Sequence, residues 1–217
     1  MTRLSHGGDT IPKQTFLNLE EDKQKRIIDA AIDEFALHSF EHANLSNIVR
    51  ASGIPRGSFY QYFEDKFDIY HYIFELVKDR KMAYLQDLLA NPEDKPFLDL
   101  FRDLFISGSR FAMDNPKMVK VFSHVLSAKD EIYDRIVKDS LGIAMDYYTR
   151  YIKSDQEKGR IRKDIDPEVF AKLVIDMTMN ISIDEIKPGS ADVNYQDMQE
   201  RITQILKIIE HGVMEGE

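Results

Sequence analysis

The segment that decides the fold spans residues 44–63 and reads NLSNIVRASGIPRGSFYQYF. Asn44 is a residue type that caps the start of a helix. Apolar or small residues then recur at helical spacing on one side: Leu45, Ile48, Val49 and Ser52. Gly53 can adopt the left-handed backbone that ends a helix, and Pro55 suits the first turn of the next one. The pattern predicts a helix, a tight turn and a second short helix.

The second short helix has two chemically different sides. Phe59 and Phe63 lie four residues apart, so we expect both rings to point inward. The outward side then carries a cation, a glycine, hydroxyls and an amide, from Arg56, Gly57, Ser58, Tyr60, Gln61 and Tyr62. Such a surface suits the major groove of DNA, and Lys66, just past the helix, suits a phosphate. We interpret the segment as a helix-turn-helix, although an ordinary helical hairpin fits the same pattern.

The whole-chain composition is that of a globular protein. The chain has 217 residues, of which 43% are hydrophobic and 31% are charged. Apolar runs stay well short of the roughly 20 residues that span a bilayer, and residues 1–19 lack the apolar core of a secretory signal. The absence of cysteine excludes disulfides and thiolate chemistry. We therefore expect a cytoplasmic protein that does not associate with membranes.

The net charge of −9 is unusual for a protein expected to bind DNA. Residues 1–66 carry 8 Lys and Arg against 10 Asp and Glu, a balance of −2, whereas residues 67–217 carry −7. DNA binding requires a locally basic surface rather than a basic total. The acidic excess lies mostly outside the predicted reading segment, so we expect modest affinity per head and two heads acting together.

Helical periodicity runs through the chain, and it predicts an all-α fold of about nine helices. We expect an N-terminal three-helix head with the helix-turn-helix over residues 1–66, in which residues 1–17 form a flexible arm. A helical bundle for effector binding and dimerisation is expected over residues 67–217. Breaks at Pro92, Pro116 and Pro188 separate the longer helices of this bundle.

The helix that begins at Pro167 is apolar on nearly every side, which predicts burial on two sides. One side would face its own domain and the other a second copy of the chain, in a symmetric dimer. The expected interface draws on this helix and the last one, through Phe170, Val174, Met177, Ile181, Ile202, Ile205 and Ile209. The alternative is that both helices belong to the core of a monomer.

The head resembles the N-terminal domain of TetR-family transcriptional regulators. The resemblance runs from about Thr15 to Ile73. It rests on spacing, turn and aromatic tail together: Ile27, Ala30, Ala31, Phe35, Phe40, Ile48, Gly53, Gly57, Phe59, Tyr60, Phe63 and Lys66. The segment EKGRIRKDIDPE at residues 157–168 is similar to the family's connection into its dimerisation helix. The resemblance implies an all-helical homodimer that binds double-stranded operator DNA and an unknown small-molecule effector, most commonly as a repressor.

The resemblance also implies roles for the residues of the head. Asn44 and Ser46 would donate to phosphates, and Arg56 would read a guanine edge or neutralise a phosphate. Gly57 would let the backbone approach a base closely. The remaining expected contacts are Ser58 and Gln61 as neutral readers, Tyr60 and Tyr62 on phosphate or a thymine methyl, and Lys66 on phosphate. Departures from the family pattern at Ser39, Asn44, Val49 and Tyr62 leave the operator sequence open.

An effector pocket is expected among the helices that follow Lys66. The candidate lining residues are Phe105, Phe111, Met113, Phe122, Met145, Tyr148 and Met177. Each of these side chains also fits plain core packing, because methionines and aromatics at helical spacing fill cores in general. An apolar or planar molecule is the expected ligand.

The sequence also leaves two other functions open, a zinc-dependent hydrolase and a protein-interaction adaptor. His38, Glu41 and His42 match the H-x-x-E-H pattern of zinc peptidases, which requires both histidines on one helical face. An all-helical protein-interaction adaptor that never touches DNA fits the same helical pattern. We expect no enzyme activity, no catalytic residue, no metal and no cofactor.

Overall fold

The structure of the chain is a computed structural model that describes residues 4–6, 9–90, 95–128, 131–184 and 195–213. It confirms the all-α fold class. The described residues form eleven helices where about nine were predicted, because α1 is additional and one expected helix is divided into α8 and α9. The helices are α1 (Gln14–Leu17), α2 (Glu21–Leu37), α3 (Leu45–Ser52), α4 (Arg56–Tyr62), α5 (Lys66–Ala90), α6 (Phe97–Asp114), α7 (Pro116–Ala128), α8 (Glu131–Ile136), α9 (Lys138–Glu157), α10 (Pro167–Asp184) and α11 (Tyr195–Val213). Two three-residue strands, β1 (Leu4–His6) and β2 (Asp9–Ile11), pair antiparallel with Leu4 opposite Ile11. In the described part of the chain, no helix combines the length and the apolar character that crossing a bilayer requires.

The chain forms two compact units, and each is described by itself. The first contains residues 1–80 and 115–137, and the second contains residues 81–114 and 138–217. The predicted division into a DNA-binding domain over residues 1–66 and an effector-binding and dimerisation domain over residues 67–217 stays a prediction.

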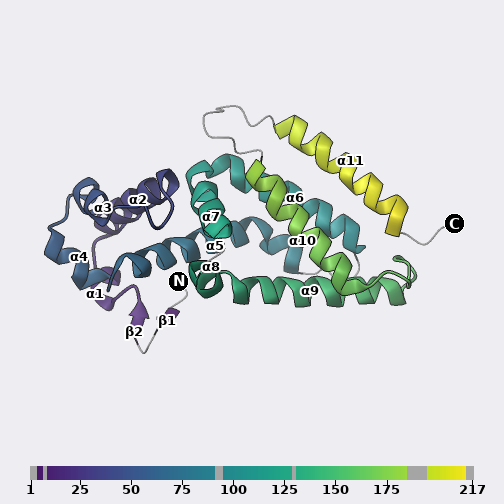
Figure 1. Cartoon of the computed structure of the whole chain (residues 1–217), viewed down its shortest axis with the longest axis horizontal. Coiled ribbons are helices and arrows are strands. Elements are labelled where there is room, and N and C mark those ends of the chain that lie inside the picture. The colour runs from purple at the N-terminus through teal and green to yellow at the C-terminus, as the bar shows by residue number, and fades with distance from the viewer. Residues whose placement is uncertain (1–3, 7–8, 91–94, 129–130, 185–194, 214–217) are drawn as a thin grey trace. The chain divides into compact units, whose positions relative to one another are not determined.

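The first unit is built on α2, α3, α4 and the beginning of α5 (Figure 1). α2 buries one apolar stripe, on which Ile27, Ala31 and Phe35 are fully enclosed. The Phe35 ring packs edge-on against Tyr70 of α5, with 4.7 Å between ring centroids. This stripe gives α3 and α4 an apolar surface against which to fold.

The N-terminal segment is packed where a flexible arm was predicted. Phe16 of α1 is fully buried, and its ring contacts Tyr62, Phe63 and Tyr72 at centroid distances of 6.1, 5.0 and 5.6 Å. Burying one phenylalanine side chain stabilises a fold by about 1.5–3 kcal/mol. The expectation of an arm is therefore wrong for α1, because an apolar side chain holds this part of the chain against the head.

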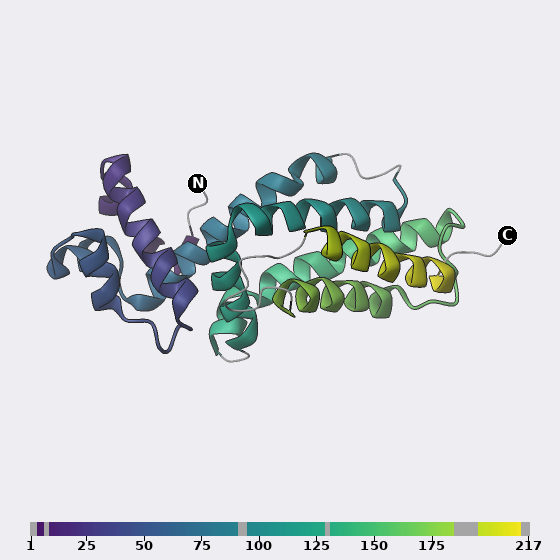
Figure 2. The same cartoon turned by 90° about the horizontal axis from the view of Figure 1, so that it is seen from above.

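The second unit packs its long helices lengthwise, as Figure 2 shows for α6, α9, α10 and α11. α10 lies along α9, and α6 contacts both α9 and α11. Their shared core consists of Phe97, Leu98, Phe101, Phe105, Ile152, Ile161, Phe170, Ala171, Val174, Leu206 and Ile209. Aromatic rings dominate the α6 side of this core.

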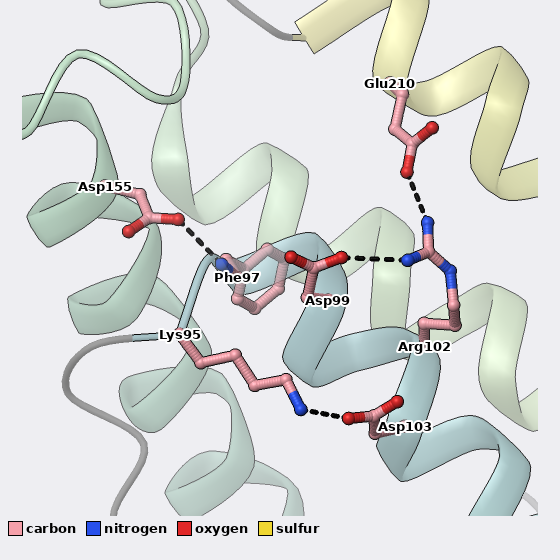
Figure 3. Close-up of polar contacts among 7 residues, drawn as sticks. All are labelled: Lys95, Phe97, Asp99, Arg102, Asp103, Asp155 and Glu210. Atoms are coloured by element: carbon pink, nitrogen blue, oxygen red, sulfur yellow. Dashed lines mark hydrogen bonds and ion pairs between the residues drawn. The ribbon is translucent and has the colours of Figure 1, made fainter.

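A buried carboxylate fixes the start of α6 in this unit (Figure 3). Asp155 of α9 is almost completely buried, and its Oδ2 accepts a hydrogen bond of 2.7 Å from the backbone N–H of Phe97. Its Oδ1 accepts from Arg160 at 3.2 Å. Asp155 thus caps the first residue of α6. Its buried negative charge is paired with the positive charge of Arg160, as a buried ionised group requires.

A second group of charges joins α6 to the last helix (Figure 3). Arg102 donates to Asp99 at 2.8 Å and to Glu210 of α11 at 2.5 Å. Lys95, two residues before the start of α6, pairs with Asp103 on that helix. All three pairs are partly exposed, so each contributes little to stability, and only the Arg102–Glu210 pair connects α6 with α11.

Candidate nucleic-acid interface

The turn between α3 and α4 has the geometry that the sequence predicted. Gly53 takes φ 68° and ψ 28°, in the left-handed region where a residue with a Cβ is strained. Its N–H donates to Arg50 O at 3.2 Å, and the N–H of Ile54 donates to Val49 O at 3.3 Å. Ile54 is buried in the corner, and Pro55 precedes the first residue of α4. The segment is a helix-turn-helix.

The start of α3 is held by a buried acid on α2. The Asn44 side chain accepts from the N–H of Ser46 at 2.9 Å, which is an N-cap. Glu34 accepts from the N–H of Asn44 at 2.7 Å and from the amide of Asn47. Asn47 in turn accepts from Arg50 at 2.9 Å, so a chain of hydrogen bonds orients an exposed arginine that the sequence reasoning missed.

The outward side of α4 carries most of the predicted reading residues. Arg56, Gly57, Tyr60 and Gln61 are exposed, and Ser58 is half-buried. Within the residues that the structure describes, Arg56 has neither a hydrogen-bond partner nor an ion-pair partner. The guanidinium is therefore available to donate two parallel hydrogen bonds to a base edge or to a phosphate.

Gly57 leaves open space on this side. Apart from its chain neighbours and the backbone of its own helix, a Cβ built at this position would have no heavy atom of the described residues within 4 Å. A glycine inside a helix is less stable than alanine by roughly 0.5–1 kcal/mol. Packing within the chain gives no reason for a glycine here, whereas the close approach of another molecule's backbone or base would.

Tyr62 was predicted to face outward, and this is wrong. Its side chain is only 5% exposed, and its ring packs edge-on against Phe16. Lys23 of α2 places its ammonium 5.6 Å from the centre of the Tyr62 ring. The reason is helical spacing, because position 62 follows the buried Phe59 by three residues and so lies on the same face.

Lys66 was predicted to hold a phosphate, but its ammonium already has partners within the head. It donates to the carbonyl oxygens of Phe40 and Ala43 at 2.6 and 3.1 Å, with a longer contact to Glu41. It also lies 4.4 Å from the centre of the Phe40 ring. Lys66 thus closes the turn between α2 and α3, and its contact with a phosphate stays a prediction.

The C-terminal end of α4 is capped by residues from the start of the chain. Lys13 donates from Nζ to Tyr60 O at 3.1 Å and from its backbone N–H to Tyr62 O at 3.0 Å. Thr15 donates its hydroxyl to Gln61 O. Sequence reasoning missed both residues, because no local pattern links positions 46 or more residues apart.

The cations of the head differ in whether an acidic side chain pairs with them. Lys13 pairs with Glu64, and Lys25 pairs with Asp29. Among the described residues, Arg26, Arg50 and Arg56 lie in no ion pair. A guanidinium nitrogen of Arg26 reaches within 3.9 Å of the place where a Cβ would stand at Gly53. The helix-turn-helix thus has basic groups near its turn, although residues 1–66 as a whole have a slightly negative net charge.

The zinc-peptidase reading is contradicted by the backbone. His38 ends α2 in an extended conformation with φ −133° and ψ 142°, and Glu41 and His42 lie in the turn that follows. The Nδ1 of His42 lies 2.9 Å from Ser39 Oγ. The two histidines therefore do not share a helical face. Over the described ranges, no group of three His, Asp or Glu side chains could hold a metal ion.

The seven predicted effector-pocket residues do not line one site. Phe105 belongs to the core of the second unit, with Met145, Tyr148 and Met177 packed against that core. Burial raises the pKa of Tyr148 to about 12.

The other three pocket candidates have different surroundings. Phe111 is buried against the Tyr84 ring, with 5.5 Å between centroids. Phe122 stacks on Phe74 in the first unit, and Met113 is 50% exposed. Only Phe105, Met145, Tyr148 and Met177 of the seven predicted residues lie in one packed group, and an effector pocket among them stays a prediction.

The predicted dimer interface also requires correction. Phe170 and Val174 are 2% and 0% exposed inside a single copy of the chain, and Ile209 is buried with them. These three residues are core, which was the alternative reading of the pattern. Met177 and Ile205 are partly buried against the same core, and the side chains of Ile181 and Ile202 lie outside the described residues.

The apolar residues that remain outward lie on other positions of the same two helices. They are Val169 and Leu173 on α10 and Ile208 on α11. Val169 and Leu173 are four residues apart, so they stand on one face of α10. Val169, Leu173 and Ile208, here called the apolar face, are among the large hydrophobic side chains that the structure leaves exposed in the described residues.

The chain is similar in sequence to known bacterial transcriptional regulators. Residues 27–73 match the profile of the family described as "Bacterial regulatory proteins, tetR family". The chain is 23% identical over 155 residues to the probable acrEF/envCD operon repressor of Escherichia coli K12, covering 70% of each chain. It is 28% identical over 148 residues to the transcriptional regulator SrpR of Pseudomonas putida, covering 64% of this chain and 62% of that one.

Solved structures with the same fold cover nearly the whole chain. A TetR family transcriptional regulator from Chloroflexus aurantiacus superposes with a TM-score of 0.75 at 25% identity, covering 95% of this chain and 100% of that one. The regulator FadR from Bacillus subtilis, in complex with stearoyl-CoA, gives a TM-score of 0.70 at 15% identity, with coverage of 87% and 98%. The fold similarity thus extends well beyond the helix-turn-helix.

We expect Lys66→Ala to lower the free energy of unfolding by about 1–3 kcal/mol, because hydrogen bonds from a charged donor to three carbonyl oxygens are lost. The slope of log Kd against log salt concentration for duplex DNA should stay unchanged. Chemical denaturation and DNA titrations at several salt concentrations measure the two quantities. Lys25→Ala is the matched control, since it removes an exposed lysine from the same head. A flattening of the slope by about one unit with unchanged stability would restore the phosphate contact.

Proposed function

Because the chain belongs to the TetR family of bacterial transcriptional regulators, we propose that it is a repressor that binds a palindromic operator as a dimer and is released by a small-molecule effector. The observation that carries the proposal is the outward side of α4, where an unpaired arginine stands beside an exposed glycine, tyrosine and glutamine. The regulators among its relatives favour DNA binding over the adaptor and hydrolase readings. Such a protein acts on DNA in the bacterial cytoplasm.

The proposed DNA contacts are of two kinds: hydrogen bonds to base edges and contacts with backbone phosphates. Arg56 and Gln61 would hydrogen-bond base edges in the major groove, and Gly57 would allow the helix to approach them. Tyr60 would contact a phosphate or a thymine methyl. Ser46, at the start of α3, would donate its hydroxyl to a phosphate where α3 crosses the backbone. Arg50, oriented by Asn47, joins this group as an additional phosphate contact.

Asn44 and Ser58 can offer DNA fewer hydrogen-bonding groups, because structural contacts or burial already occupy part of each side chain. Asn44 uses its side-chain oxygen to cap α3, so only its amide N–H groups remain for a phosphate. Ser58 is half-buried and offers a single hydroxyl. Tyr62 and Lys66 are left out of the proposed interface, since both are engaged inside the head.

We expect Arg56→Ala to weaken binding to the preferred duplex by roughly 1–3 kcal/mol if the guanidinium reads a base. The preferred duplex is obtained by selection from a random library with the full chain, and a scrambled duplex of equal composition serves as the reference. Equal losses on both duplexes would assign Arg56 to a phosphate instead. Arg110→Ala, an exposed arginine in the second unit, should leave both affinities unchanged. Failure of the wild-type chain to select any sequence would contradict the proposed function.

The proposed dimer forms through the apolar face of Val169, Leu173 and Ile208. Exposed large apolar side chains that gather on neighbouring helices mark interaction sites in soluble proteins. A two-fold axis would place two heads on successive major grooves, roughly 34–36 Å apart, and this spacing is what makes the operator palindromic. Since each head has few unpaired cations, the second head is needed for useful affinity.

We expect Ile208→Glu to shift the protein towards a monomer, because two charges would meet across the two-fold interface without partners. Ile208 and Ile143 are exposed to nearly the same extent, 74% and 72%, which makes Ile143→Glu on α9 the matched control. Light scattering at micromolar concentration measures the mass of each variant. Loss of the dimer in both variants, or in neither, would contradict the assigned face.

The proposed effector binds within the second unit, where Phe105, Met145, Tyr148 and Met177 share a core. Methionine and aromatic side chains adapt to apolar and planar ligands at low free-energy cost. The same fold in FadR of Bacillus subtilis is described in complex with stearoyl-CoA, which supports an apolar ligand of some kind for this chain. An effector that prefers a form with a different head spacing lowers operator affinity through linkage.

We expect at least one compound in a panel of acyl-CoA thioesters and planar aromatic drugs to lower operator affinity by roughly 5–150-fold, the usual range of allosteric coupling. Fluorescence anisotropy of the selected duplex measures the affinity with and without each compound. A matched titration with the scrambled duplex separates release from competition for the DNA surface. Unchanged operator affinity across the panel would leave effector control without support.

A further inference from the structure

The recognition helix α4 lacks the features that hold a helix end in place. It has seven residues, whereas an isolated helix needs roughly 12–15 to be stable in water. Pro55, at its N-cap, has no side-chain acceptor, and its last turn contains no basic residue that would balance the helix dipole. Two of its exposed residues, Tyr60 and Gln61, lie next to the C-terminal end. Whatever orders this end also orders the residues that face DNA.

The carbonyl oxygens at the end of α4 are fully accounted for. Phe59 O accepts from the N–H of Phe63 at 3.0 Å. The three that follow are Tyr60 O, Gln61 O and Tyr62 O, and residues 13–16 supply a donor to each of them. A helix leaves its last four carbonyls without partners inside the helix, so this segment completes α4 from outside.

The donors come from a segment with its own anchor. Phe16 is fully buried against Phe63 and Tyr72, which fixes residues 13–16 on the head. Lys13 also pairs with Glu64, directly after the helix. The ammonium of Lys13 supplies the positive charge that the last turn of α4 lacks. One apolar side chain thus holds two polar neighbours against three consecutive carbonyls.

We propose that residues 13–16 form a positioning clip that fixes the C-terminal end of α4 and thereby the sequence selectivity carried by Tyr60 and Gln61. This inference rests on the proposed DNA-binding function. Lys13 and Thr15 are positioning residues, since they act through the α4 backbone and need not touch DNA. Without the clip, α4 frays at the end where its readers stand, and ordering it again on a preferred site reduces affinity for that site. Binding to unspecific DNA needs no fixed reader geometry and is spared.

The test compares Thr15→Val, which removes the hydroxyl donor at nearly constant volume, with Thr15→Ser, which keeps it. Lys13→Met removes the ammonium, and Lys25→Met is its control, because both lysines pair with one carboxylate and carry the same charge. The duplexes are one selected by the wild-type full chain and its scrambled counterpart. Each clip variant should bind the selected duplex roughly three- to tenfold more weakly, as expected for the loss of one hydrogen bond. Thr15→Ser and Lys25→Met should retain wild-type selectivity.

A readout without DNA keeps the clip separate from the proposed function. Hydrogen exchange of the amides in the last turn of α4 should become faster in Thr15→Val and Lys13→Met, while the amides of α3 keep their wild-type rates. Equal weakening on both duplexes would indicate loss of folded protein and would overturn the positioning role, as would unchanged exchange in α4. If the wild-type chain selects no sequence, the proposed function fails, but the exchange experiment still decides whether the clip orders α4.

Discussion

The head depends on the burial of Phe59 and Phe63 beneath the recognition helix. Both rings are excluded from water, and they stack with 5.6 Å between centroids. Each buried ring stabilises the fold by about 1.5–3 kcal/mol, which is more than a seven-residue helix gains from its own hydrogen bonds. Because these rings fix which side of α4 faces inward, they also fix the side on which Arg56 and Tyr60 face outward. The packing of Phe59 and Phe63 therefore determines which side chains α4 exposes.

Local features of this head could be predicted from the sequence because they depend on neighbours along the chain. Gly53 ends α3 in the left-handed region, and Asn44 caps its start, as their residue types indicate. Tyr62 was predicted wrongly although the necessary information was local. Its hydroxyl favoured an outward position, whereas its spacing of three from Phe59 placed it inside, and the area of a buried aromatic ring outweighs one hydroxyl.

Remote contacts could not be predicted in this way. Lys66 donates to carbonyls more than twenty residues earlier, and Lys13 caps carbonyls 47 and 49 residues later. A lysine in a sequence carries no sign of whether its ammonium will meet a phosphate or a carbonyl. The faces of α10 were ambiguous for a different reason, because a helix that is apolar on all sides has no periodicity to tell Phe170 from Leu173. Only the packed structure assigns one to the core and the other to water.

Both units use side chains from one element to cap the end of another. Glu34 of α2 holds the start of α3, and Asp155 of α9 holds the start of α6. In α4 such capping has a further effect. Residues 13–16 donate hydrogen bonds to the last carbonyl oxygens of the helix, so the exposed side chains of α4 are not needed to cap it. Arg56 and Gln61 can therefore be exchanged for other residues without weakening the helix that presents them. A scaffold of this kind separates stability from recognition, so that the exposed side chains of α4 can change while the buried rings and caps of the head stay the same.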